Sequence, residues 1–343
     1  MATKVKLPLR MGTRQRVQKV GTVPFVPGSS GTTLELPRVG LVNRLIIQFR
    51  GTITATAAGI VAGGDTPWSL LSRIRVSLNT GSASLVDVTG MGAYILQRTY
   101  NEFQAQRGTV NDSHFIPQTV AANATSALAF TLVLPIAANN GDAFALGAIN
   151  LQAPEVRMTL DLMFGQLADY GTGVASIAGS FHVGYMFYEV PPLNAYELPP
   201  LALCRTLEES QAVVNTGENV YTVPRMGAVL SVAHLVYLNG ARSDSWDEVT
   251  IRLNKSDAPY RIERGFQRAL ETYNYNEFPI TGGIVQDFYR AYEAPNMGDL
   301  RDAVDSEEVS TLESIVAINS AATLGAGNNT LRTVRRILQV MEG

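Results

Sequence analysis

An internal repeat constrains the fold of this chain more than any other feature of its sequence. Residues 73–103 align with residues 248–278 without a gap, at a constant offset of 175 residues. Eight aligned positions are identical, where chance gives roughly two in a window of this length. The identical pairs are Leu78 and Leu253, Asn79 and Asn254, Ala83 and Ala258, Gly90 and Gly265, Tyr100 and Tyr275, Asn101 and Asn276, Glu102 and Glu277, and Phe103 and Phe278.

Each copy of the repeat has the pattern of a strand, a turn and a short helix. The helical patterns cover 91–100 and 264–275, and each has a glycine at or just inside its start. A long β-prone run precedes each copy, at 41–54 and at 228–238. This common order favours duplication of a whole domain, and a coincidental match between two β-rich segments is the alternative.

Strand patterns dominate the rest of the chain. Runs of alternating apolar and polar residues are separated by turns rich in Gly, Asn and Pro, which is typical of β-sandwiches and barrels. Further candidate strands lie at 73–78, 127–134, 156–162, 181–188, 248–253, 312–318 and 331–340. We therefore predict two β-domains of similar topology, each with a helix after an early strand.

Two proline pairs mark the boundary between these domains. They flank the segment 191–200, which cannot be a central strand and favours a stiff, extended spacer. The length of 343 residues fits two domains of roughly 150 residues each. We expect a basic N-terminal arm over 1–34, a first domain over 35–190 and a second over 201–343.

Residues that carry common enzyme chemistry are scarce or isolated. The sequence has no Gly-Lys pair for a phosphate loop, no Gly-x-Ser-x-Gly elbow and a single cysteine, Cys204. Its histidines, His114, His182 and His234, are far apart and lack the His-x-His pair of a metal-binding jelly-roll enzyme. We therefore expect a protein without enzyme activity, cofactor or metal, and histidines with packing roles.

Charge and hydropathy argue against three further kinds of interaction. The net charge of −3 gives no global basic field, so we expect no sequence-specific nucleic-acid binding. Acidic residues gather over 299–313 without an Asp-x-Asp-x-Asp-Gly loop, which favours a solvated loop over a calcium site. No apolar segment follows the basic start, and none has the roughly 20 residues that a membrane-spanning helix needs.

Together these patterns resemble the double jelly-roll major capsid proteins of tailless icosahedral phages with an internal membrane, such as the tectiviruses. Residues 39–47 look like the first long strand of that family, and 70–76 look like the next. Residues 90–94 look like the helix that follows, and 185–190 like the last strand of the first roll. The resemblance covers the chain from Pro37 onward and lies in pattern and order.

The resemblance implies both a fold and a function. The fold would be all-β, with two tandem eight-stranded antiparallel jelly rolls and short inserted helices. The function would be that of a major capsid protein, made in the host cytoplasm, whose homotrimers form pseudo-hexameric capsomers that tile an icosahedral virion. The implied partners are further copies of this chain, neighbouring capsomers, a penton or vertex protein and the lipids of an internal viral membrane.

The N-terminal arm is basic and contains no acidic residue before Glu35. Its prolines and the run 28–31 favour an extended segment. One interpretation is an arm on the inner face of the shell that contacts anionic lipid or the genome, and the other is a disordered, solubilising tail. The residues that would make the contact are Lys4, Lys6, Arg10, Arg14, Arg16 and Lys19.

Two alternative classes remain at this point. A β-sandwich that binds a receptor or a carbohydrate would display a cluster of exposed aromatic residues, whereas Trp68 and Trp246 are isolated. Each tryptophan precedes the first strand of a repeat copy, which favours a structural role. A jelly-roll enzyme is the other class, and the missing metal ligands argue against it.

Overall fold

The computed structural model describes most of the chain and shows two compact units. The division between them falls between Cys204 and Arg205. The described residues are 5–6, 14–79, 83–97, 114–138, 147–189, 196–197, 202–275, 279–288 and 303–340.

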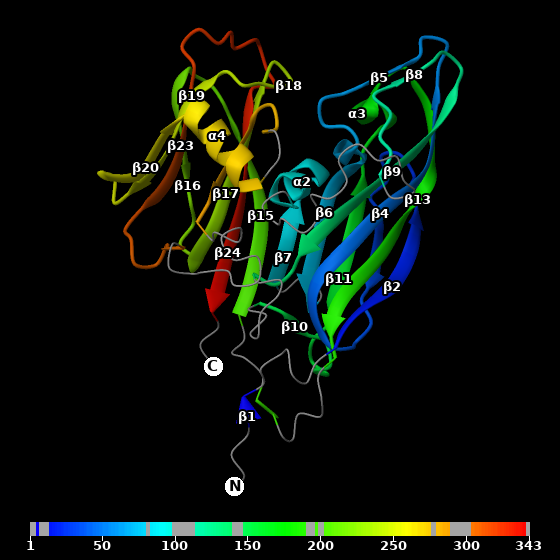
Figure 1. Ribbon diagram of the computed structural model, residues 1–343, viewed down its shortest axis with the longest axis horizontal. Coiled ribbons are helices and arrows are strands. Elements are labelled where there is room, and N and C mark those ends of the chain that lie inside the picture. The colour runs from blue at the N-terminus through cyan, green and yellow to red at the C-terminus, as the bar shows by residue number, and fades with distance from the viewer. Residues whose placement is uncertain are drawn as a thin grey trace. The chain divides into compact units, whose positions relative to one another are not determined.

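Two sheets, each with four long or medium-length strands, form most of the first unit (Figure 1). Their strands are β2 (Gln15–Pro24), β3 (Thr32–Glu35), β4 (Leu41–Ala55), β6 (Leu71–Leu78), β7 (Ala83–Val88), β9 (Thr125–Pro135), β11 (Met158–Phe164) and β13 (Val174–Tyr188). One sheet has the order β2-β13-β4-β9, and the short strand β10 (Ile149–Asn150) also pairs with β4. The other sheet has the order β7-β6-β11-β3.

The core of the first unit lies between its two sheets. Apolar residues alternate with polar ones along the strands, so that one face of each sheet is buried. Phe164 of β11 stacks on Phe181 of β13 with 5.2 Å between ring centroids, which joins the two sheets. Phe49 and Phe130 add to this cluster, and both are fully buried. Burial of each such side chain stabilises the fold by about 1.5–3 kcal/mol.

Two sheets with the same arrangement form the second unit. Their strands are β15 (Ala202–Ala212), β16 (Gly217–Thr222), β17 (Ala228–Leu238), β19 (Trp246–Leu253), β20 (Asp257–Glu263), β21 (Gly283–Asp287), β23 (Leu312–Ile318) and β24 (Thr330–Val340). One sheet has the order β15-β24-β17-β21 and the other the order β16-β23-β19-β20. Trp246 is fully buried between them, against Val249, Val316 and Leu331.

Strand order is therefore the same in both units, along the chain and within the sheets. In each, the third strand pairs with the sixth and the eighth, and the fourth pairs with the fifth and the seventh. A helix follows the fifth strand of each unit, α2 (Gly90–Gln97) in the first and α4 (Arg264–Tyr275) in the second. Within the described residues, the chain is two tandem eight-stranded jelly rolls with inserted helices, as the sequence predicted.

Several short strands and helices lie between the main strands of the two rolls. None of the helices in the described part of the chain is long and apolar enough to cross a membrane. The remaining elements are β1 (Val5–Lys6), β5 (Ile60–Ala62), β8 (Thr119–Val120), β12 (Gly171–Thr172), β14 (Tyr196–Glu197), β18 (Ala241–Arg242), β22 (Val304–Asp305), the 3-10 helix η1 (Trp68–Leu70) and α3 (Leu167–Tyr170).

The start of the first roll differs from the boundary expected at residue 35. Strand β2 pairs with β13 from Gln15 to Pro24, and β3 pairs with β11, so both belong to the roll. Of the ten residues of β2, only Val23 is buried. A strand without an alternating apolar pattern gives no signal in the sequence, because its pairing with β13 and not its composition fixes it. The expected linker over 191–200 lies outside the described residues except for the backbone of β14.

Candidate functional site

The asparagine of the repeat has the same structural role in both rolls. Asn79 and Asn254 directly follow strands β6 and β19 with φ of 47° and 51°, a conformation that asparagine tolerates better than most residues. The side-chain Oδ1 of Asn79 accepts a hydrogen bond from the backbone N of Arg157 at 2.8 Å. The Oδ1 of Asn254 accepts one from the backbone N of Ser310 at 2.7 Å. Each asparagine thus fastens its turn to the segment that leads into the neighbouring strand, β11 or β23.

The other described repeat positions also match. Leu78 and Leu253 are the last residues of their strands, and Ala83 and Ala258 lie at the start of the next strands. Gly90 is the first residue of α2, and Gly265 is the second of α4. The segment Tyr100, Asn101, Glu102 and Phe103 lies outside the described residues, as do Asn276, Glu277, Phe278 and the side chain of Tyr275. The second half of the repeat therefore stays a prediction.

The two inserted helices are held in different ways. Helix α2 buries most of its apolar residues, and the ring of Tyr94 stacks on Trp68 with 4.2 Å between centroids. Helix α4 is amphipathic and buries the polar side chains of Gln267 and Glu271. Phe266, on its outer side, is 63% exposed. The repeat conserves the position of the helix and not the chemistry of its contacts.

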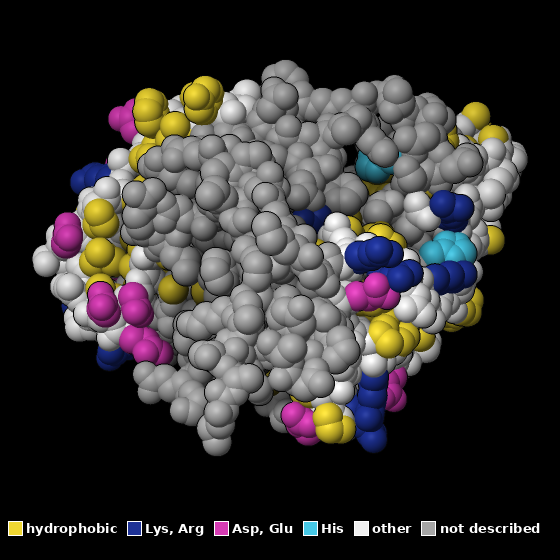
Figure 2. Space-filling model, turned by 60° about the horizontal axis from the view of Figure 1, so that its bottom comes forward, with side chains coloured by type: hydrophobic (Ala, Val, Ile, Leu, Met, Phe, Trp, Pro, Cys, Tyr) yellow, Lys and Arg dark blue, Asp and Glu magenta, His cyan; other side chains and the backbone are white. Residues whose placement is uncertain are grey.

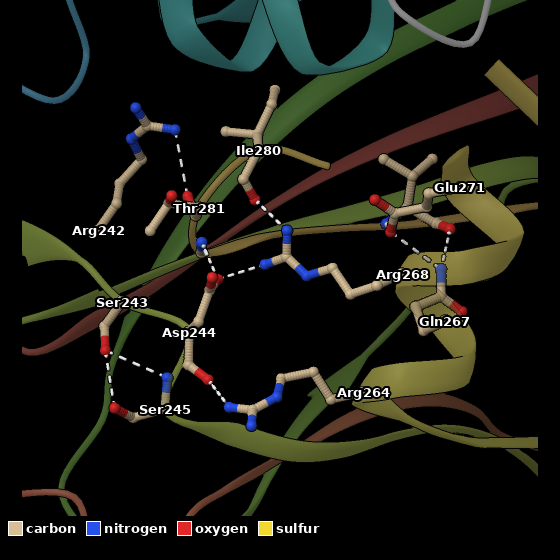
Figure 3. A network of polar contacts seen from close by, with 12 residues as sticks. Arg242, Ser243, Asp244, Ser245, Arg264, Gln267, Arg268, Glu271, Ile280 and Thr281 are labelled. Carbon is tan, nitrogen blue, oxygen red and sulfur yellow. Dashed lines mark hydrogen bonds and ion pairs between the residues drawn. The ribbon is translucent and has the colours of Figure 1, made fainter. Parts of the chain in front are cut away.

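Polar contacts attach α4 to the second roll (Figure 3). The Oδ1 of Asp244 accepts hydrogen bonds from the guanidinium of Arg268 and from the backbone N of Gly282, the latter at 2.6 Å. The backbone oxygen of Asp244 accepts a further bond from Arg264. Asp244, which lies just before β19, therefore holds the helix and the segment before β21 together.

Two buried side chains of α4 bind β21. Nε2 of Gln267 donates to the backbone oxygen of Val285 at 2.7 Å, and Oε1 of Glu271 accepts from the backbone N of Val285 at 2.9 Å. Gln267 also donates to Glu271 at 3.0 Å. These contacts satisfy polar groups that would be costly to bury alone. No sequence pattern predicts these contacts, because the partners lie on elements that are adjacent only in the fold.

Histidine His234 lies in the core of the second roll. Its side chain is fully buried, with Nδ1 2.9 Å from Oγ1 of Thr333 and Nε2 2.6 Å from Oγ of Ser314. Ser314 in turn donates to Oε1 of Gln286 at 2.8 Å. Burial lowers the pKa of His234 to about 3, so the ring is neutral near pH 7. A serine beside a histidine has a nucleophile's geometry, yet complete burial keeps any substrate away from this pair.

The other two histidines lie in the first unit. His182 of β13 is partly exposed, and its Nδ1 lies 3.2 Å from Oγ1 of Thr22. Burial, and then the charges of Lys19 and Arg50, lower the pKa of His182. His114 is half-buried, and burial lowers its pKa. The structure brings none of the three histidines together.

The remaining candidate groups do not form a reactive site either. Cys204 is fully buried, and burial raises the pKa of its thiol. In the described part of the chain, no group of three or more His, Cys, Asp or Glu residues could hold a metal ion. Of the acidic run, Asp305 accepts a hydrogen bond from the backbone of Glu307, and Glu313 pairs with Arg252 at 2.7 Å.

Three of the six basic arm residues have side chains in the described part of the chain. Arg16 and Lys19 are exposed on β2, and Arg14 immediately precedes it. Arg16 forms an ion pair of 2.6 Å with Glu189. Lys4 and Arg10 lie outside the described residues, as does the side chain of Lys6. These three described residues are therefore positioned by the first roll and not by a separate arm.

Comparison with known proteins identifies the fold. No family model matches this sequence, and no curated protein sequence does either. Among solved structures, the MCP of STIV, the Sulfolobus Turreted Icosahedral Virus, has a TM-score of 0.70 at 15% identity, covering 94% of this chain and 97% of that chain. A quasi-atomic model of the PBCV-1 virus capsid has a TM-score of 0.60 at 12% identity, covering 98% and 95%.

A third solved structure is the major capsid protein P2 from bacteriophage PM2. Its TM-score is 0.52 at 11% identity, covering 96% of this chain and 98% of that chain. In all three cases the match extends over nearly the whole length of both chains. The fold of this chain is therefore the double jelly roll of solved viral capsid structures.

Proposed function

We propose that this chain is a major capsid protein, a structural subunit of an icosahedral viral shell. The observation that carries the proposal is the double jelly roll itself, which matches capsid structures over nearly the whole chain. On this proposal the protein functions in the virion.

Assembly and not catalysis is the proposed mechanism. One chain supplies two similar rolls, so a homotrimer presents six similar wedges and a nearly hexagonal outline. Contacts between different surfaces of successive copies can close such a ring. The groups capable of chemistry support this view, since His234 and Cys204 are buried away from any substrate.

The segment before β2 extends the proposal to a further partner. Lys4, Lys6 and Arg10 would contact anionic lipid headgroups or the genome on the inner face of the shell. Each basic residue near an anionic membrane contributes about 1 kcal/mol, so the attraction would be weak and sensitive to salt. We leave Arg14, Arg16 and Lys19 out of this contact, because Arg14 directly precedes β2 and the other two lie within it. A penton or vertex protein would complete the shell.

Negative-stain electron microscopy of the purified chain tests the proposal. We expect particles with a hexagonal outline at low concentration, and flat lattices of them at high concentration. Single-chain particles at every concentration, with no lattice, would overturn the capsid function.

A further inference from the structure

Charge is divided unevenly among the four sheets of the two rolls. The strands β2, β4, β9 and β13 contain four Lys or Arg residues and no Asp or Glu. The strands β16, β19, β20 and β23 contain six Asp or Glu residues and two Arg. We call these the basic sheet and the acidic sheet.

The other two sheets are close to neutral. The strands β3, β6, β7 and β11 contain two basic and three acidic residues, and β15, β17, β21 and β24 contain four basic and three acidic. The two halves of the sequence differ in charge in the same direction. Residues 1–204 contain 14 Lys or Arg and 11 Asp or Glu, whereas residues 205–343 contain 13 and 19. The imbalance is therefore concentrated in one sheet of each roll.

Two of the four cations of the basic sheet give its outer face a positive charge, since Arg44 is buried and Arg16 pairs with Glu189. Lys19 of β2 and Arg50 of β4 are exposed, while their neighbours Phe49 and Phe181 point into the core. Both cations lie close enough to His182 to affect its protonation. Figure 2 shows, at the right of the view, a histidine side chain among Lys and Arg side chains. No ion pair joins Lys19 or Arg50 to another described residue, so their charge is available to a partner.

The acidic sheet carries a row of carboxylates across its strands. Glu218 of β16 and Glu248 of β19 both pair in register with Ala317 of β23, and Glu248 pairs with Glu263 of β20. Like charges opposite one another destabilise a sheet. Arg261 offsets part of this repulsion through its 2.8 Å contact with Glu248. Glu218 and Glu263 are exposed, and Glu218 also lies 3.8 Å from Arg252, so cations of the same sheet offset part of the negative charge and a cationic partner would offset more.

We propose that the basic sheet of one copy of this chain docks on the acidic sheet of a second copy. This inference rests on the proposed function, since it names the surfaces through which the shell subunit assembles. The contact joins unlike surfaces, so three copies can close into a ring. Charge complementarity of this kind fixes which surfaces meet and disfavours contacts between two basic or two acidic sheets.

Charge-reversal variants test this contact. The first variant is Lys19→Glu with Arg50→Glu, and the second is Glu218→Lys with Glu263→Lys. We expect the trimer of each to dissociate at a concentration about tenfold higher or more, measured by sedimentation, because repulsion replaces attraction. Combining all four substitutions restores opposite charges across the contact, so trimer formation should recover. The trimer of the unchanged chain should weaken in high salt.

Matched controls change the same number of charges elsewhere on each unit. They are Arg38→Glu with Arg157→Glu, and Glu307→Lys with Glu308→Lys, all exposed positions outside the two sheets. We expect these chains to assemble as the unchanged chain does. Thermal unfolding checks that every variant is folded. If a reversal variant unfolds, Lys19→Gln with Arg50→Gln replaces it. This neutral variant should also weaken the trimer, but by a smaller factor.

The outcomes separate this contact from the proposed function. Trimers that withstand both reversals, or a folded four-substitution chain that does not recover, overturn the contact alone. Equal weakening by the matched controls also overturns it, because net charge and not these two surfaces would then govern assembly. An unchanged chain that stays monomeric at every concentration overturns both the contact and the proposed function.

Discussion

At the scale of single residues, the two glycines of the repeat have different surroundings. A Cβ added to Gly90 would lie 2.1 Å from the backbone oxygen of Trp68, whereas a Cβ added to Gly265 would meet nothing within 4 Å. The same residue at this repeat position therefore does not have the same structural reason in both copies. Gly90 is required by the close approach of α2 to η1, and Gly265 is not required by any contact among the described residues.

Alanine substitutions separate these two cases. Gly90→Ala should lower the free energy of unfolding by about 1–3 kcal/mol, because the backbone of Trp68 must move to admit the methyl group. Gly265→Ala should raise it by about 0.5–1 kcal/mol, because alanine favours a helix more than glycine does. Urea denaturation of both variants measures the two changes. Equal destabilisation by both would show that Gly265 has a steric role that its open surroundings do not indicate.

His234 makes the stability of the second roll depend on pH. The pKa of the unfolded side chain is 6.5, and burial lowers the folded value to about 3. As pH falls below 6.5, the unfolded chain binds a proton that the folded chain does not. The free energy of unfolding should therefore fall with decreasing pH, by at most about 1.4 kcal/mol per pH unit from this group.

Replacing this histidine tests the effect. His234→Gln should be less stable at pH 7 by about 1–3 kcal/mol, because hydrogen bonds in the core are disturbed. Its stability should nevertheless fall less steeply between pH 6.5 and pH 4 than that of the unchanged chain. His182→Gln, at a partly exposed position, should keep most of the steep dependence. Parallel curves for the unchanged chain and His234→Gln would contradict this account of the core.

At the scale of elements, β2 decides where the chain can be shortened. Deleting residues 2–13 leaves all of β2 in place, and the first roll should keep its thermal stability. Deleting residues 2–20 removes six residues of β2, five of which pair with β13, and it should lower the melting temperature by several degrees. Differential scanning calorimetry of the two truncated chains distinguishes them.

The shorter deletion also tests the basic segment before β2. We expect the chain without residues 2–13 to bind anionic liposomes more weakly at low salt, because Lys4, Lys6 and Arg10 are missing. Flotation of both chains at low and high salt measures this difference. Equal flotation would mean that the segment is only a solubilising tail.

The sequence predicted those elements whose own residues carry a periodic pattern. Helix α4 begins at Arg264 and ends at Tyr275 as predicted, because its apolar and polar residues alternate with a helical period. The alternation along 312–318 likewise predicted β23. Strand β2 escaped detection because one buried residue gives no period. Pattern alone thus revealed the two rolls and not the start of the first.

Polar partners could not be predicted in the same way. His234 lies 80 residues from Ser314 and 99 from Thr333, so only the pairing of strands brings them together. The row that contains Glu218 and Glu263 likewise depends on strand register and not on sequence distance. Sequence reasoning found the duplicated scaffold, and the surfaces proposed for assembly required the fold.

At the scale of the whole molecule, the two rolls share one strand order but differ in the charge of their sheets. The shared order accounts for the scaffold, and the difference in charge accounts for the proposed assembly. Two rolls with one strand order give a chain whose halves are alike in shape, which suits a ring of six wedges. The opposite charges of the basic and acidic sheets make the halves unlike at the surface. Unlike surfaces favour a closed ring of copies that all face the same way.

The mass of the purified chain in solution tests the central claim most directly. Light scattering coupled to size-exclusion chromatography gives this mass without assumptions about shape. A shell subunit with two rolls per chain predicts a species of three times the chain mass of 37.0 kDa, stable at low salt and at micromolar concentration. A species of 37.0 kDa at every concentration and salt would contradict the capsid function.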